Sequence, residues 1–188
     1  MANVALRPQV PSRPTPNVPI PPISEPTDGT TNQRKHVTVL FADIVVSTKL
    51  VAGLDPEDAR DFLNRSIEKM THSIEAVGGV VAKTMGDGLF SLFGAPLAQE
   101  DHAYRACHAA LDIISSTKHL KAPDGSLLRL RVGLCSGTAV VNVSEENGRV
   151  NLDAIGEVVN DAAHLEEAAK PGTALISEST TLLAQNDI

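Results

Sequence analysis

The feature of this sequence that most constrains its fold is a three-residue turn between two short, mainly apolar runs. The runs cover residues 80–85 and 89–93, and only Gly86, Asp87 and Gly88 separate them. An Asp-Gly pair readily adopts the positive φ angles of a tight hairpin turn. The sequence therefore predicts two antiparallel strands joined at Asp87.

Apolar patterning on either side of this hairpin predicts alternating strands and helices. Residues 36–41 are β-branched and apolar, which is typical of a buried strand, and this strand ends at Asp43. Asp55, followed by Pro56, is a typical N-cap for a helix that ends at Gly78. The other expected elements are a helix over 101–120, strands over 127–135, 138–143 and 149–153, a helix over 158–170, a strand over 173–177 and a short terminal helix.

The order of these elements, β-α-β-β-α-β with further strands and a helix appended, predicts an α+β fold. It is the ferredoxin-like arrangement, in which helices cover one face of a mainly antiparallel sheet. In such a sheet the first and third strands are central neighbours. Within the helix over 101–120, the residues at helical spacing are Tyr104, Cys107, Leu111 and Ile114.

The amino-terminal part of the chain differs from the rest in proline content. Eight of the twelve prolines fall within the first 26 residues, which removes the backbone donors that helices and sheets need. We therefore expect an extended, proline-rich tail or linker over residues 1–35, and one folded domain over residues 36–188 of the 188-residue chain.

Composition argues against several classes of partner. A net charge of −7, 3% aromatic residues and no tryptophan oppose binding to nucleic acid. No apolar run approaches the roughly 18 residues of a membrane span. The two cysteines, Cys107 and Cys135, have neither a disulfide-framework nor a zinc-site spacing. A reducing, cytoplasmic location fits these features.

Two acidic residues stand where a sheet of this kind would bring them together. Asp43 ends the first strand, and Asp87 lies in the hairpin that opens the third. Adjacent carboxylates repel unless a cation lies between them, and oxygen ligands suit Mg²⁺ or Mn²⁺. In the alternative interpretation, Asp87 only forms the turn and Asp43 only caps the following segment.

Four longer motifs, in this order and spacing, resemble the catalytic domain of class III nucleotidyl cyclases, the adenylate and guanylate cyclases. They are VTVLFADIVVST, AKTMGDGLFSLFGAP, RVGLCSG and DAIGEVVNDAAHLE, and FGAPLAQEDHAYRACHAAL is similar to the bacterial branch. The resemblance covers residues 36–188. It implies that Asp43, Asp87 and the backbone carbonyl of Ile44 hold two Mg²⁺ or Mn²⁺ ions, which assist attack of the ribose 3′-hydroxyl on the α-phosphate.

The same resemblance implies a substrate and its binding residues. Lys83 and Asp153 match the lysine and the acid that read adenine, because a lysine donates to N1 and a carboxylate accepts from the N6 amine; ATP is therefore the expected substrate. Ser47 and Thr48 are expected to bind the substrate too, and Asn160 to orient the ribose. In the alternative interpretation Lys83 is a solvated strand residue, Asp153 an ordinary acid at a strand end and Asn160 a polar residue in an exposed helix turn.

The sequence departs from the family pattern at three points. His164 stands where the family has an arginine that contacts the triphosphate, and it either acts as a weaker, acid-favoured substitute or has no role. Val46 replaces a glycine found in many relatives, which crowds the approach of the triphosphate. The chain stops at Ile188, before the further pair of strands that family domains generally have, so we expect those strands to be lacking.

The resemblance also implies a dimer, because the metal aspartates and the base-reading residues of one site come from different subunits. A head-to-tail homodimer is expected, and a heterodimer with a complete partner is the alternative. The main functional hypothesis is an adenylate cyclase in cyclic nucleotide signalling. A weakly active or silent nucleotide-binding regulatory module is the second hypothesis, and a palm-type polymerase, which would need a basic track for nucleic acid, is the third.

Overall fold

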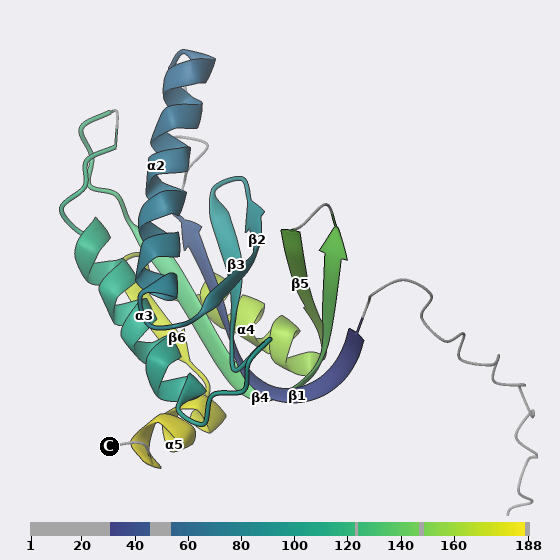
Figure 1. Cartoon of the computed structure of the whole chain (residues 1–188). Coiled ribbons are helices and arrows are strands. Elements are labelled where there is room, and N and C mark those ends of the chain that lie inside the picture. Colours follow the sequence, from purple (N-terminus) through teal and green to yellow (C-terminus); the bar gives the residue numbers. More distant parts are fainter. Residues whose placement is uncertain (1–30, 46–53, 123, 147–148, 187–188) are drawn as a thin grey trace, which may run out of the picture.

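The fold is a six-stranded sheet with helices on both faces, seen in a computed structural model of the chain (Figure 1). The structure describes residues 31–45, 54–122, 124–146 and 149–186. The strands are β1 (Thr31–Ile44), β2 (Val80–Met85), β3 (Gly88–Phe93), β4 (Leu130–Glu146), β5 (Arg149–Ile155) and β6 (Thr173–Ile176). The helices are α2 (Pro56–Glu75), α3 (His102–Thr117), α4 (Glu157–Ala168) and α5 (Glu178–Asn186).

The sheet has the order β2-β3-β1-β4-β5, and β6 pairs with β4. All pairings are antiparallel except that between β4 and β6. β1 lies between β3 and β4, so the first and third strands are neighbours as expected. The α+β fold with a mainly antiparallel sheet is therefore confirmed.

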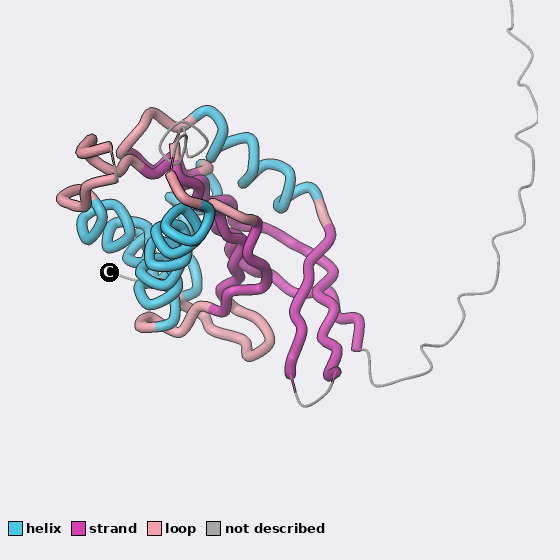
Figure 2. The backbone as a smooth tube through the Cα atoms, turned by 90° about the horizontal axis from the view of Figure 1, so that it is seen from above, coloured by secondary structure: helices cyan, strands magenta, loops and turns pink. Residues whose placement is uncertain are grey.

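The two helices of the ferredoxin-like core, α2 and α3, cover one face of the sheet as expected, and the appended helix α4 covers the other. Leu40, Ala42 and Ile44 of β1 are buried against α2 and α3, whereas Val37 and Val39 are buried on the face that α4 covers. Figure 2 shows α4 on one side of the sheet and α2 with α3 on the other. The central strands are apolar on both faces, so each face needs a covering layer.

Two strands are longer than the sequence indicated. β1 begins at Thr31, so the expected tail over residues 1–35 extends five residues too far; residues 31–35 are missed because they are polar and pair with β4 alone. β4 is one continuous strand where two were expected. Ser136 and Gly137, which separate the two expected strands, pair in register with Thr38 and Val37 of β1.

The start of α2 agrees with its sequence signal, but the buried face of α3 does not. The Asp55 carboxylate accepts a hydrogen bond from the backbone N–H of Glu57 at 3.0 Å, as expected for an N-cap of α2. On α3, however, Leu111 is 66% exposed, and the buried face is made chiefly of small residues, which include Ala103, Ala106 and Ala110. Small side chains let α3 approach the sheet closely. The helical spacing of larger apolar residues such as Leu111 did not indicate this face.

Candidate functional site

Asp43 lies at the end of β1, on the face of the sheet that α4 covers. In the strand register it is opposite Gly88 of β3 on one side and Arg131 of β4 on the other. A Cβ atom at Gly88 would lie 2.9 Å from the Asp43 Oδ1 atom and 2.9 Å from the carbonyl oxygen of Ala42. Glycine at this position therefore leaves room for the Asp43 carboxylate.

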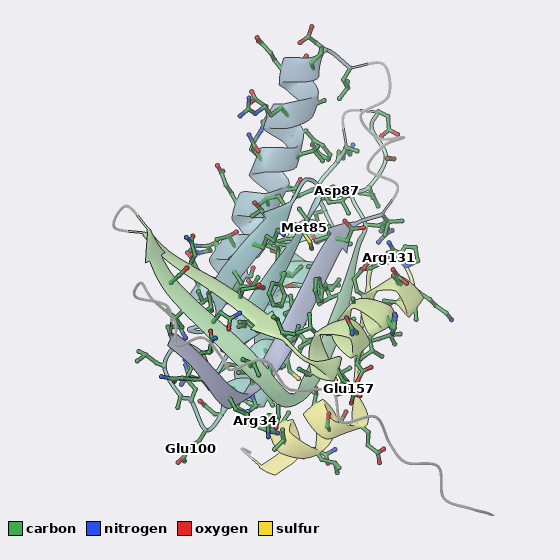
Figure 3. The ribbon with its side chains drawn as sticks, turned by 90° about the vertical axis from the view of Figure 1, so that its right-hand side faces the viewer. Arg34, Met85, Asp87, Glu100, Arg131 and Glu157 are labelled. Atoms are coloured by element: carbon green, nitrogen blue, oxygen red, sulfur yellow. The ribbon has the colours of Figure 1, made fainter. Side chains whose placement is uncertain are left out.

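Asp87 lies in the turn between β2 and β3, at the same end of the sheet. Its backbone carbonyl accepts a hydrogen bond from the backbone N–H of Ile44 at 3.3 Å, which ties the turn to the residue after Asp43. Figure 3 shows Asp87 and Arg131 at this end, near the tip of β1. The hairpin and the central strand thus bring the two aspartates together, as the sequence indicated.

The electrostatics of Asp43 are those of a carboxylate near another negative charge. Burial raises its pKa above the ordinary value, and the negative charge of Asp87 raises it further. Arg131 opposes this shift through a hydrogen bond and its positive charge, but the pKa of Asp43 remains raised. A divalent cation between the two aspartates would relieve this repulsion.

The donor set fits a hard cation with several non-protein ligands. In the described part of the chain, no three His, Cys, Asp or Glu side chains cluster tightly enough to enclose a metal ion. The candidate oxygen donors at this end of β1 are the carboxylates of Asp43 and Asp87 and the backbone carbonyl of Ile44. Mg²⁺ and Mn²⁺ suit such a set, because they are commonly bound by one or two carboxylates with substrate phosphates and water.

Sequence reasoning missed two charged residues at this site. Arg131 donates a hydrogen bond from Nη2 to Asp43 Oδ2 at 3.3 Å, and its Nε atom lies 3.0 Å from Glu166 Oε1. Burial raises the pKa of Glu166, and Arg131 counteracts that shift. A signal was present in the sequence, since Arg131 is a charged residue placed directly between the apolar residues Leu130 and Val132.

A close approach of helix and strand places Glu166 next to Arg131. A Cβ atom at Gly133 would lie 2.2 Å from the carbonyl oxygen of Ala162 and 2.2 Å from the backbone nitrogen of Glu166. Only a residue without a side chain lets α4 pack this closely on β4. Because Arg131 and Gly133 project from the same face of β4, Glu166 comes to lie over the arginine.

Comparison with known proteins identifies the family. Residues 30–187 match the model of the adenylate and guanylate cyclase catalytic domain. This chain belongs to that family. It is 28% identical over 160 residues to adenylate cyclase 1 of Rhizobium meliloti, a match that covers 82% of this chain and 24% of that protein. The chain thus spans about a quarter of that relative's length.

Solved structures of class III cyclase domains share the fold. The adenylyl cyclase CyaB from P. aeruginosa superposes with a TM-score of 0.72 at 29% identity, covering 83% of this chain and 83% of that one. The guanylate cyclase domain of RhGC from Catenaria anguillulae, solved in complex with GTP, gives 0.73 at 31% identity, covering 80% and 83%. Both adenylyl and guanylyl cyclases are therefore among the similar proteins.

The other candidate residues of the cyclase domain lie on β2, β5 and α4. Lys83 lies on β2, opposite Phe90 of β3, and its side chain is exposed. Asp153 lies on β5, opposite Asn142, and its carboxylate accepts a hydrogen bond from the backbone N–H of Ala154. No hydrogen bond or ion pair joins Lys83 to Asp153. β2 and β5 nevertheless contact each other, although β3, β1 and β4 separate them in the sheet order.

Two further candidates lie on α4. Asn160 is in the first turn of that helix and His164 is four residues later, and both side chains are exposed. Val46, Ser47 and Thr48 lie outside the described residues. The structure thus brings Asp43 and Asp87 together, and presents the base-reading and ribose-binding candidates as exposed side chains on β2, β5 and α4.

Proposed function

We propose that this domain is an adenylate cyclase that converts ATP to 3′,5′-cyclic AMP and pyrophosphate. The observation that carries the proposal is the position of Asp43, which lies opposite Gly88 and beside Asp87 on a domain of the cyclase family. In the reaction the ribose 3′-oxygen bonds to the α-phosphorus, and the bond from the α-phosphorus to the pyrophosphate oxygen breaks.

Asp43, Asp87 and the carbonyl of Ile44 form the proposed metal half-site. These groups would hold two Mg²⁺ or Mn²⁺ ions, which when bound supply a more acidic 3′-hydroxyl and neutralise the triphosphate. The support is the position of Asp43 near Asp87: burial and then the negative charge of Asp87 raise the pKa of Asp43, and a cation between the two carboxylates would relieve that repulsion. Gly88 leaves the space in which the Asp43 carboxylate can turn toward such an ion.

Lys83 and Asp153 are the proposed base-selecting residues, and they favour ATP over GTP. A lysine donates to N1 of adenine and a carboxylate accepts from the N6 amine, whereas guanine presents a donor at N1 and an acceptor at O6. The contact between β2 and β5 supports this assignment, because it brings the strands that carry the two residues to the same region of the surface.

Asn160 and His164 are the proposed ribose- and triphosphate-binding residues. They are one helical turn apart on α4, so both side chains project from one face of the helix. Because both side chains are exposed, they can contact a substrate that is held by the metal half-site of a second subunit. The imidazole of His164 gives a weaker contact than an arginine would, because it is shorter and lacks the planar fork of donors that a guanidinium offers to phosphate oxygens.

A head-to-tail homodimer is the proposed active form. Apolar side chains are exposed on three strands, with Met85 of β2 at 44%, Val140 of β4 at 38% and Ile155 of β5 at 63%. Such residues are suited to burial in an interface. In the proposed dimer the metal half-site of one subunit faces the β2, β5 and α4 residues of the other, which would produce two equivalent sites.

Mixing two inactive variants tests this shared-site proposal. Asp43→Asn and Asn160→Ala should each abolish cyclic AMP formation, and a mixture should recover about one quarter of the wild-type rate, because half of randomly formed dimers contain one intact site. The matched control is a mixture of Asp43→Asn and Asp87→Asn, which damages the same half-site in both chains and should recover nothing. Equal recovery in both mixtures would contradict the shared site.

The second candidate function is a weakly active or silent cyclase module that acts through a partner subunit. The observation that favours it is His164 in the position of the family's arginine. This candidate gains support if His164→Arg is as inactive as the wild-type chain while ATP still binds. A cytoplasmic location is part of both candidates, and two free cysteines support it.

A further inference from the structure

Arg131 is held between two carboxylates without being fixed on either. Its hydrogen bonds to Asp43 Oδ2 and to the carbonyl of Glu167 are both 3.3 Å, longer than the roughly 2.8 Å of a strong charge-assisted hydrogen bond. Its Nε atom is 3.0 Å from Glu166 Oε1, yet the N–H bond is not directed at that oxygen. Both of those atoms are shielded from water.

This arrangement leaves a better hydrogen bond unmade. Arg131 Nε–H and Glu166 Oε1 are both shielded from water and lie 3.0 Å apart. A small rotation of the guanidinium would form a hydrogen bond between them. Its present position instead keeps Nη2 at the Asp43 carboxylate, which is partly buried and lies near Asp87. Arg131 therefore offsets negative charge at the metal half-site in the metal-free chain.

We propose that Arg131 is the resident cation of the metal half-site, and that it gives up its hydrogen bond to Asp43 and turns its Nε–H onto Glu166 when a divalent ion binds. The inference rests on the proposed function, because it requires that Asp43 binds the metal. Arg131 and Glu166 act through Asp43 and are positioning residues. Glu166 favours metal binding by accepting the displaced guanidinium, and Arg131 opposes metal binding by occupying Asp43.

The fold keeps the acceptor carboxylate in place for this transfer. Gly133 brings α4 onto β4 in such a way that the backbone of Glu166 is fixed over the strand, independently of the ion pair. Glu166 thus remains within reach of Arg131 in both arrangements. The same helix carries Asn160 and His164, so Arg131 also connects the metal half-site to the helix with the proposed ribose- and triphosphate-binding residues.

The test is Mn²⁺ binding to the full chain without nucleotide. Binding is measured as the loss of the six-line electron paramagnetic resonance signal of aqueous Mn²⁺. Removing the competing cation in Arg131→Met should lower the Mn²⁺ Kd by roughly threefold to tenfold. Removing the acceptor in Glu166→Gln should raise the Kd by a similar factor, because the guanidinium then stays on Asp43. The two variants are expected to shift the Kd in opposite directions.

Three control variants separate this inference from a general charge effect and from the proposed function. Arg129→Gln and Glu167→Gln change charge at exposed side chains close by in the sequence and should leave the Kd within about twofold of wild type. Asp43→Asn should abolish the binding. If it does not, or if the wild-type chain binds no Mn²⁺, both the metal half-site and the inference fail.

The inference alone fails if Asp43→Asn abolishes binding while Arg131→Met and Glu166→Gln leave the Kd unchanged or shift it in the same direction. Thermal unfolding without metal checks that each variant is folded. Should Arg131→Met not fold, Glu166→Gln decides the question, since it keeps the shape of the side chain. A Kd for Glu166→Gln equal to or lower than the wild-type value would overturn the proposal.

Discussion

Arg131 lies directly opposite Asp43 in the pairing of β4 with β1, and its Nη2 atom is 3.3 Å from the Asp43 carboxylate. The pairing register sets this relationship, so the arginine cannot leave the neighbourhood of the aspartate without disrupting the sheet. On the other side of Asp43, Gly88 contributes no side chain. The negative charge of Asp43 is therefore offset by Arg131 on one side of β1. On the other side, toward Asp87, no side chain covers the carboxylate from Gly88.

Replacing Gly133 by alanine should destabilise the domain, because the new methyl group would lie 2.2 Å from the backbone of α4 and the helix would have to move. We expect a loss of about 2 kcal/mol or more in the free energy of unfolding, typical of overpacking a buried contact. Denaturant titration measures it. Gly137→Ala is the matched control, since its methyl group would meet only the Val158 side chain at 3.4 Å. An equal loss in both variants would contradict the close packing of α4.

Replacing Asp43 by asparagine should stabilise the metal-free domain at neutral pH. The pKa of Asp43 is raised by burial and by Asp87, so its ionisation opposes folding. This cost is absent below the ordinary pKa of 3.8 and is complete once the pH exceeds the raised value. The melting temperature of Asp43→Asn should exceed that of wild type at pH 7, and the difference should shrink as the pH is lowered toward 4.

Asp161→Asn is the control for this pH series, because Asp161 is an exposed acid on α4. It should follow the wild-type melting temperature across the range. A wild-type protein more stable than Asp43→Asn at pH 7 without metal would show that the contact with Arg131 outweighs burial and repulsion.

Replacing His164 by arginine should raise the rate of cyclic AMP formation by about tenfold or more, because an arginine stays charged and can contact two phosphate oxygens at once. His164→Ala should be slower than the wild type, because it has no side chain that can donate to the triphosphate. Initial rates of cyclic AMP formation measure both effects. His119→Arg, which adds the same charge at another exposed position, should leave the rate unchanged.

Exchanging the base-selecting chemistry should move the preference from ATP toward GTP. In the double variant Lys83→Glu, Asp153→Asn, a carboxylate faces the N1 donor of guanine and an amide donor faces O6. We expect the ratio of kcat/KM for ATP to that for GTP to fall by at least about tenfold, since each lost hydrogen bond leaves a polar group unpaired. Lys118→Glu is the charge control. An unchanged ratio in the double variant would remove Lys83 and Asp153 from the base site.

The hairpin and the neighbouring positions of Asp43 and Asp87 could be predicted from the sequence. The hairpin depends on a local turn signal, and the position of the two aspartates depends on that turn and on the order of elements. The Gly-Asp-Gly turn joins β2 and β3, and the order of elements places β3 beside β1. The start of β1 at Thr31 could not be predicted so readily. Residues 31–35 are polar, and their strand conformation depends on pairing with β4, which is far away in the sequence.

The Arg131–Glu166 contact could not be predicted from local patterns for a similar reason. It depends on α4 covering the second face of the sheet, and on Gly133 allowing the helix to come close. A glycine in a strand indicates a bulge, a bend or a close backbone approach, but not which of these occurs. The buried face of α3 was obscured because four alanines make up most of it, and Leu111, a larger apolar residue at helical spacing, is exposed.

Cyclic nucleotide formation by the purified chain with Mn²⁺ or Mg²⁺, supplied with ATP and separately with GTP, decides whether this domain is an adenylate cyclase. We expect cyclic AMP from ATP, little cyclic GMP from GTP, and no product from Asp43→Ala in either case. Product formation that persists in Asp43→Ala, or a preference for GTP, would contradict this expectation.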